Sequence, residues 1–111
     1  MAYDEALADE IRAAIGDEPG LTEKAMFGGL GFLVHGNMAV AASGHGGMLV
    51  RAGRERGAEL AHEDGVEPMV MQGRPMAGWL HVTGPALAGE DDVTRWVALG
   101  LDVARALPPK G

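Results

Sequence analysis

The sequence predicts an α+β fold of two layers, in which an antiparallel sheet of about five to six strands carries three helices. Two patterns predict this class. Near both ends of the chain, apolar residues recur at the spacing of an amphipathic helix. Between them, short segments with alternating apolar positions are separated by glycine-containing turns, as in antiparallel strands. The expected order is one helix, three or four strands, a short helix, two strands and a final helix.

The first helix is expected at residues 3–15. Its apolar stripe recurs at every fourth position and consists of Tyr3, Leu7, Ile11 and Ile15. Acidic residues in the first turn complement the helix dipole, and Gly16 provides a stop at the other end.

Short strands follow, at residues 24–27, 30–35, 38–42 and 48–51. Apolar residues alternate along the second of them, which is the period of a β-strand. Gly36 and Asn37 both tolerate positive φ and therefore predict the tight turn of a hairpin. The glycine-rich residues 43–47 predict the next turn.

A short helix and a second hairpin are expected next. The helix covers residues 54–62, and Gly65 lies just past its end. The residues expected to face inward are Ala58, Leu60 and Ala61. Two strands, at residues 67–72 and 77–83, are joined around Gly73-Arg74-Pro75.

The last helix has the clearest signals. It begins at the acidic residues 90–92 and stops at Pro108-Pro109. Its apolar side consists of Val93, Trp96, Val97, Leu101 and Ala104.

Length and composition indicate one domain. The chain has 111 residues, of which 47% are hydrophobic, enough for a core without metal or disulfide crosslinks. We expect the domain to span residues 1–107 and residues 108–111 to form a frayed tail. The absence of cysteine excludes disulfides, thiolate metal sites and cysteine nucleophiles.

Charge and hydropathy restrict the expected partners and location. The formal net charge of −7 argues against a large nucleic-acid footprint, which needs a basic face. The longest apolar runs are far shorter than the roughly 18 residues that a membrane helix requires. The acidic first residues lack the basic and apolar regions of a signal peptide. The sequence therefore predicts a cytoplasmic protein without direct nucleic-acid or membrane partners.

Both faces of the first long hairpin are apolar. Leu30, Phe32, Val34 and Val40 occupy one face, and the other face holds Leu33, Ala39 and Ala41. An antiparallel sheet that faces water normally shows polar residues there. If the three helices cover one face only, we expect a partner to cover part of the second, most simply another copy of the chain. The alternative is that small residues are tolerated in solvent.

Two short motifs carry a family resemblance. Met26-Phe27-Gly28-Gly29 leads into a hairpin, and Gly73-Arg74-Pro75-Met76 follows in the second half of the chain. In this order they resemble the TfoX N-terminal-domain family. That domain is the N-terminal half of the TfoX/Sxy competence regulators and also occurs as small stand-alone proteins. The resemblance extends roughly from residue 3 to residue 106.

The resemblance implies a two-layer α+β fold and a non-enzymatic protein-interaction module, related to transcriptional co-regulation. It implies no catalytic, cofactor or metal residues, and a regulator as the partner, whereas the expectation of a second copy rests on the apolar hairpin. The expected interaction surface consists of Met26, Phe27, Gly28, Gly29, Arg74, Pro75 and Met76. Methionine and arginine are both enriched at protein interfaces.

Two glycine-rich segments resemble parts of catalytic sites, but both are explained more simply as turns or strand starts. The glycines of residues 28–31 open a strand, whereas a phosphate loop opens a helix and contains a lysine. Ser43 and His45 lie in one glycine-rich turn without a nucleophile elbow. An enzyme built on Ser43, His45 or His81 is therefore the least favoured function.

Metal binding is also disfavoured. The four histidines lack the spacing of a metal site. Met69, Met71 and Met76 could in principle bind copper(I), but methionine more often fills cores and interfaces.

The arginines offer the alternative function. Arg51, Arg54 and Arg56 form a basic cluster, and Arg74 could approach it through strand pairing. Arg51, Arg54 and Arg74 would then contact an anion, in a small-ligand-binding domain with an arginine-anchored pocket. Interleaved acidic residues favour the simpler interpretation of a solvated helix face.

Overall fold

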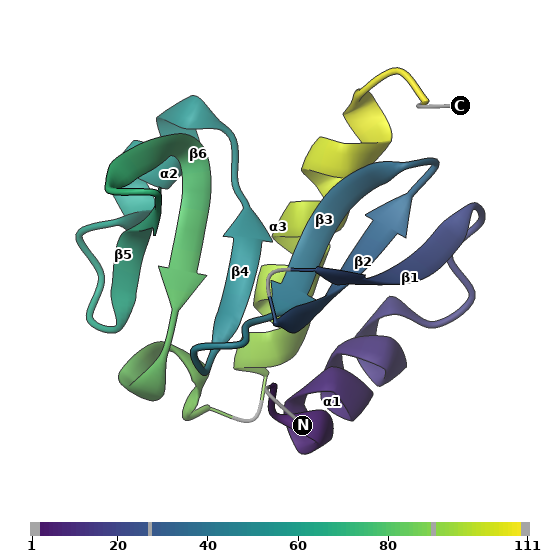
Figure 1. Ribbon diagram of the computed structural model, residues 1–111, viewed down its shortest axis with the longest axis horizontal. Helices are drawn as coiled ribbons and strands as arrows, with labels where there is room; N and C mark the ends of the chain where they lie inside the picture. Colours follow the sequence, from purple (N-terminus) through teal and green to yellow (C-terminus); the bar gives the residue numbers. More distant parts are fainter. Residues whose placement is uncertain (1–2, 27, 90, 110–111) are drawn as a thin grey trace.

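The computed structural model describes residues 3–26, 28–89 and 91–109. The described part contains three α-helices and six strands in the expected order, so the predicted α+β fold class is confirmed (Figure 1). A short 3₁₀ helix, which the sequence did not indicate, precedes the last α-helix. The elements are α1 (Glu5–Ile15), β1 (Leu21–Met26), β2 (Gly29–Val34), β3 (Asn37–Ala42), β4 (Met48–Arg51), α2 (Arg54–Leu60), β5 (Val66–Met71), β6 (Arg74–Val82), η1 (Gly84–Leu87) and α3 (Asp92–Ala106).

The strands form one antiparallel sheet in the order β1-β2-β3-β4-β6-β5. The first four strands are a meander. After β4 the chain passes through α2 to the far edge, runs along β5 and returns as β6 to pair with β4 (Figure 1). The edge strands are therefore β1 and β5, which are distant from each other in sequence.

The helix signals are confirmed at both ends of the chain. The Asp4 side chain accepts a hydrogen bond from the backbone N–H of Leu7 at 3.2 Å and caps α1, and Gly16 ends it with φ of 62°. The buried residues of α1 include Leu7, Ile11 and Ile15, as the periodicity predicts. All five apolar positions named for α3 are buried.

Both predicted hairpin turns are wrong by one residue or more. Val34 pairs with Asn37, so the first turn is His35-Gly36 rather than Gly36-Asn37. Met71 pairs with Arg74, so the second turn is Gln72-Gly73, and Arg74 and Pro75 belong to β6. The reason is conformational, because His35 and Gln72 adopt φ of 49° and 53°. Sequence rules assign such left-handed positions to glycine and asparagine.

Asn37 has a structural role in place of the predicted turn position. It is buried, and its side-chain amide donates a hydrogen bond to the Pro108 carbonyl at 2.9 Å. This bond ties the start of β3 to the segment that follows α3.

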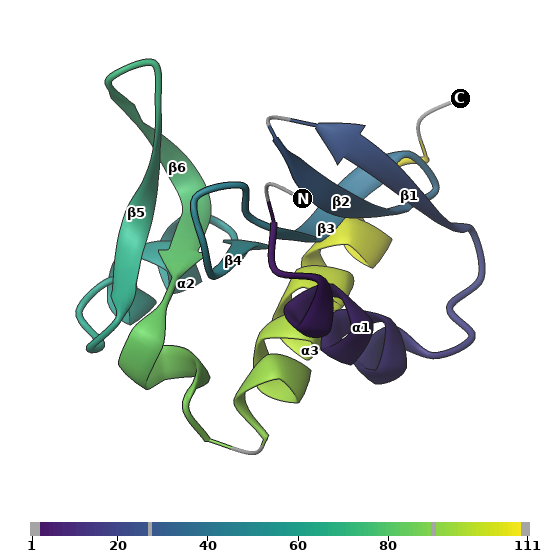
Figure 2. The same cartoon turned by 60° about the horizontal axis from the view of Figure 1, so that its bottom comes forward.

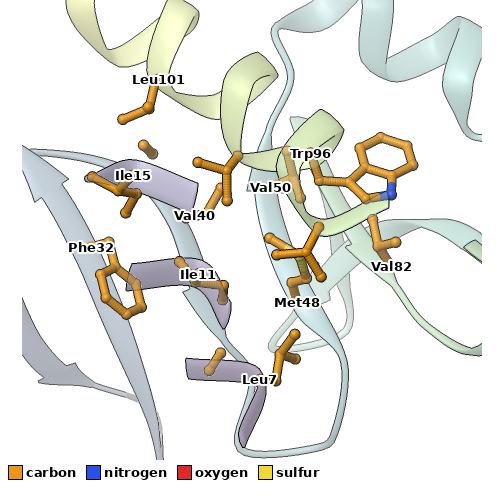
Figure 3. Packing of buried hydrophobic residues seen from close by; sticks show 14 of the residues in the cluster. Leu7, Ile11, Ile15, Phe32, Val40, Met48, Val50, Val82, Trp96 and Leu101 are labelled. Carbon is orange, nitrogen blue, oxygen red and sulfur yellow. The ribbon is translucent and has the colours of Figure 1, made fainter. Parts of the chain in front are cut away.

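All three helices lie on one face of the sheet, which we call the covered face (Figure 2). The core fills the space between this face and α1 and α3, and its largest buried side chains include Trp96, Phe32, Ile11 and Met48 (Figure 3). The opposite face, the open face, has no helix packed on it among the described residues.

Two residues lie on the side opposite to the one expected. Phe32 pairs with Val40 and Leu33 with Met38, so Ala39 has no partner at a β-bulge. The bulge turns both Ala39 and Val40 into the core, and the prediction of Ala39 on the second face is wrong. Ala58 is exposed rather than inward-facing, because Gly57 is the residue of α2 that lies against the sheet.

Ion pairs join the helices to the rest of the covered side. The Arg12 guanidinium of α1 donates two hydrogen bonds of 2.8 Å to Glu23 of β1, and Arg105 of α3 binds the carboxylate of Glu18. The hydrogen bonds from the arginines hold the pKa of Glu18 and Glu23 below the ordinary value. Within the described ranges, none of the helices has the length and apolar character needed to span a bilayer.

Candidate functional site

The open face carries apolar side chains at its centre. Strand register places Ala41, Leu49 and His81 side by side across β3, β4 and β6, while their neighbours along each strand enter the core. Leu49 and His81 are half-buried although no helix lies over them. Charged residues occur toward the sheet edges, with Lys24 on β1 and Glu67 on β5. This face therefore has a mostly apolar centre, which includes His81, and a charged rim.

A hollow of about 260 Å³ lies on this face, between the strands at the centre and the β5–β6 hairpin. None of its lining residues is Asp, Glu, Lys or Arg. Four of them are methionines that come from three strands, namely Met26, Met38, Met69 and Met71. The remaining lining residues are Gly29, Ala41, Ala42, Ser43, Gly44, His45, Leu49, Val70, Gln72 and His81.

Gly31 has no side chain and so leaves space for two of these methionines. A β-carbon at residue 31 would lie 3.0 Å from Met38 Sδ and 3.2 Å from Met26 Cε, and no side chain occupies that position. Both thioethers therefore rest over the bare backbone of β2. The methionines of β1 and β3 approach each other across a strand because residue 31 is glycine.

The loop between β3 and β4 closes one end of the hollow. Ser43 Oγ accepts a hydrogen bond from the backbone N–H of His45 at 3.0 Å, and His81 Nε2 lies 2.7 Å from the Gly46 carbonyl. In the part of the chain that the structure describes, no hydrogen bond joins Ser43 Oγ to an imidazole. The two groups act here as parts of a hydrogen-bonded turn. No cluster of three His, Asp or Glu side chains with a metal-binding arrangement occurs among the described residues.

The predicted interaction surface is divided between two places. Met26 and Gly29 line the hollow. Met71 and Gln72, at the tip of the β5–β6 hairpin, also line it. Gly28 is exposed beside them, with φ of 75°. Phe27 lies outside the described residues.

The Arg74-Pro75-Met76 part of the prediction faces elsewhere. Arg74 is exposed at the start of β6. Pro75 and Met76 line a second hollow of about 330 Å³, between α2 and β6, together with Arg54 and Gly57. This hollow is on the covered side, so Met76 does not lie with Met69 and Met71.

The three arginines of the predicted anion contact also lie apart. The Arg51 guanidinium stacks on Trp79 at 4.9 Å and donates to the Met38 carbonyl at 3.3 Å, and burial lowers its pKa. Arg74 begins β6, five residues before Trp79, which is a separation of about 16 Å along a strand. Arg54 lies at the start of α2, on the covered side. The three side chains therefore come from three different elements, β4, α2 and the start of β6.

Comparisons with known proteins identify the family. Neither the curated proteins nor the solved structures contain a match to this chain. Among protein families, the TfoX N-terminal domain matches residues 13–104 of the 111. The match spans all six strands of the sheet, the last turn of α1 and most of α3. The chain therefore belongs to the TfoX N-terminal-domain family.

Proposed function

We propose that the protein is a non-enzymatic protein-interaction module that acts as a transcriptional co-regulator and binds its partner through the open face. One observation carries this proposal: no helix among the described residues packs on the open face, yet Met, Leu and Ala side chains make up most of its centre, beside His81. A water-facing antiparallel sheet normally alternates with polar residues at these positions. Family membership supports the regulatory role.

The layout of the open face resembles the general anatomy of an interface. Interfaces commonly have an apolar centre, a polar rim, and more methionine, aromatic and arginine residues than other surfaces. Here the centre is apolar, Lys24 and Glu67 lie at the edges, and the Arg51–Trp79 stack occupies one end. Methionine is unbranched and polarisable, so it adapts to the shape of a partner.

The shape of this face favours a convex element of another protein. The β5–β6 hairpin rises above the sheet on the open side, and β1 and β2 rise opposite to it (Figure 2). Two sheets that stack face to face lie about 10 Å apart, which a raised hairpin obstructs. We therefore propose a regulator protein as the occupant, and a second copy of the chain is the competing outcome.

Site-specific photo-crosslinking in the native host tests the proposal. A benzophenone side chain placed at residue 49 on the open face is expected to crosslink one transcription regulator or polymerase component. The same group at residue 58, exposed on α2, serves as the control. Crosslinks to the same proteins from both positions, or from residue 49 to a second copy alone, would contradict the regulator proposal.

Purified components provide the second measurement. Leu49→Lys places a charge in the apolar centre and is expected to weaken binding of the identified partner more than about tenfold. Ala58→Lys, on the opposite side, should leave the affinity unchanged. Equal affinities of the two variants for the partner would remove the open face from the interaction.

A further inference from the structure

We propose that the hollow on the open face is a binding site for a small uncharged aromatic molecule of about two fused rings. This inference goes beyond the proposed function, because it concerns a free small molecule rather than a protein partner. Three properties of the hollow carry it: the chemistry of its walls, the absence of charge, and its size.

The walls are made of thioethers that can close around a flat ring. Met26 and Met38 lie over Gly31 on one side, and Met69 and Met71 project from β5 on the other. Sulfur–aromatic contacts are favourable, and a methionine has enough rotatable bonds to follow the shape of a ring.

The lining selects against charged ligands. None of the lining residues is Asp, Glu, Lys or Arg, so an ionised ligand would lose its hydration without a counter-charge. Polar groups are still present at the margin. Among the described residues, the His45 imidazole and the Gln72 amide have no hydrogen-bond partner within the protein. They could bind a single polar atom, such as a ring N–H, and so orient the ligand.

The size fits two fused rings. An apolar cavity of about 150 Å³ holds benzene. The hollow has about 260 Å³, which leaves room for a second ring. Ala41, one of its lining residues, contributes only a methyl group and so takes up little of this space.

The test is a titration of the ¹⁵N-labelled protein with indole, followed by amide chemical shifts. We expect saturable shifts confined to the residues that line the hollow, namely residues 26, 29, 38, 41–45, 49, 69–72 and 81. Cyclohexanol, which has no π-system, and indole-3-carboxylate, which is charged, are expected to bind at least about tenfold more weakly. Absence of saturation at the solubility limit of indole, or equal binding of cyclohexanol, would overturn the proposal.

Two pairs of variants locate the site. Ala41→Leu fills the floor and should abolish the indole shifts, whereas Ala58→Leu, outside the hollow, should not. Met69→Leu conserves volume and removes a thioether, so it should weaken indole binding without affecting the fold. Met76→Leu is its matched control, since Met76 lines a different hollow. Unchanged binding in both Ala41→Leu and Met69→Leu would place the indole elsewhere and refute the assignment.

A further probe separates the two sources of an aromatic group. N-acetyltryptophanamide presents the indole ring as a protein side chain does. Tighter binding of this amide than of indole would show that the hollow receives a residue of a partner, and would overturn the small-molecule proposal. The crosslinking experiment at residue 49 does not depend on indole, so the two proposals can fail separately.

Discussion

The covered and open faces of the sheet both carry apolar residues, but these residues have different surroundings. Along β3 and β4, Val40 and Val50 enter the core and are fully buried, while their neighbours Ala41 and Leu49 face the other way. Both sets are apolar, yet only the first is packed against helices. Apolar composition therefore does not distinguish a face that stabilises the fold from one that is available for contact. The difference lies in what covers each face.

Close backbone approach explains how the helices seal the covered face. At Gly100 of α3, an added β-carbon would lie 2.5 Å from the Ala39 carbonyl oxygen. At Gly57 of α2, it would lie 3.3 Å from the Cα of Gly78 on β6. Glycine at these positions lets the two layers come together more closely than side chains would allow. The open face has glycine too, at residue 31, but there the space holds the ends of two methionines.

The largest expected loss of stability comes from truncating a large side chain that is buried against the covered face. Trp96→Ala should lower the free energy of unfolding by about 3–5 kcal/mol, because it removes a fully buried indole and leaves a cavity. It also removes the hydrogen bond of 3.0 Å that Trp96 Nε1 donates to the Ala86 carbonyl. Urea denaturation followed by far-ultraviolet circular dichroism measures this loss.

The matched substitution on the open face is Leu49→Ala. Leu49 is only half-buried, so its truncation should cost less than about 1.5 kcal/mol. If this loss equals that of Trp96→Ala, the open face is a second core, sealed by a copy of the chain. Sedimentation velocity over a range of protein concentrations would then reveal the dimer.

The next largest effect on stability is expected from replacing glycine by alanine, and two glycines on opposite faces can be compared. Gly100→Ala should lower stability by about 1–2 kcal/mol, because its β-carbon would meet the backbone of Ala39 and Val40 Cγ1 at 2.7 Å. The intrinsic gain of about 1 kcal/mol for alanine over glycine in a helix offsets part of this cost.

On the open face, Gly31→Ala should be neutral or stabilise by up to about 0.5 kcal/mol. Its nearest neighbours are flexible methionine ends, which can move aside. Thermal and urea denaturation of both variants measure the difference. A loss at Gly31 as large as that at Gly100 would mean that the methionines are packed rigidly, contrary to their proposed adaptability.

Most of the fold could be predicted from the sequence because its elements have strong local signals. The four-residue spacing of Leu7, Ile11 and Ile15 fixes α1, and residues 30–35 show the period of a strand. The turns were displaced because His35 and Gln72 adopt a left-handed conformation that their side chains do not indicate. Ala39 was misplaced because a β-bulge changes the alternation, and bulges depend on pairing with a neighbouring strand.

The candidate site was less predictable because it depends on contacts between distant strands. Met69 and Met71 are two residues apart on β5, which indicates a shared face. Nothing local indicates that Met38 of β3 lies near them, or that Met26 belongs to the same hollow. The pairing of β4 with β6 creates that proximity, and it depends on the crossover through α2. The same dependence separates Met76 from the other methionines.

Arg51 is a charged residue that stacks on an aromatic ring of the open face. Arg51→Lys should lower stability by about 0.5 kcal/mol, because lysine lacks the planar guanidinium that stacks on Trp79. Arg54→Lys, exposed at the start of α2, is the control and should have no measurable effect. Equal stabilities of the Arg51→Lys variant and the wild type would show that the stack does not order this end of the face.

A small, pH-dependent effect is expected for an ion pair on the covered side. Arg105 lowers the pKa of Glu18, so the folded state binds protons less readily than the unfolded chain. The contribution to stability is therefore present above the unfolded pKa of about 4.3, and it disappears as the pH falls through the lower folded value.

Glu18→Gln should cost less than about 1 kcal/mol at pH 7, since the arginine is solvated. Urea denaturation from pH 7 to pH 3 should show the variant and wild type converging in acid, and a constant difference would mean that the carboxylate charge is irrelevant. Open-face substitutions such as Leu49→Ala should show no such convergence, because their cost does not depend on this carboxylate.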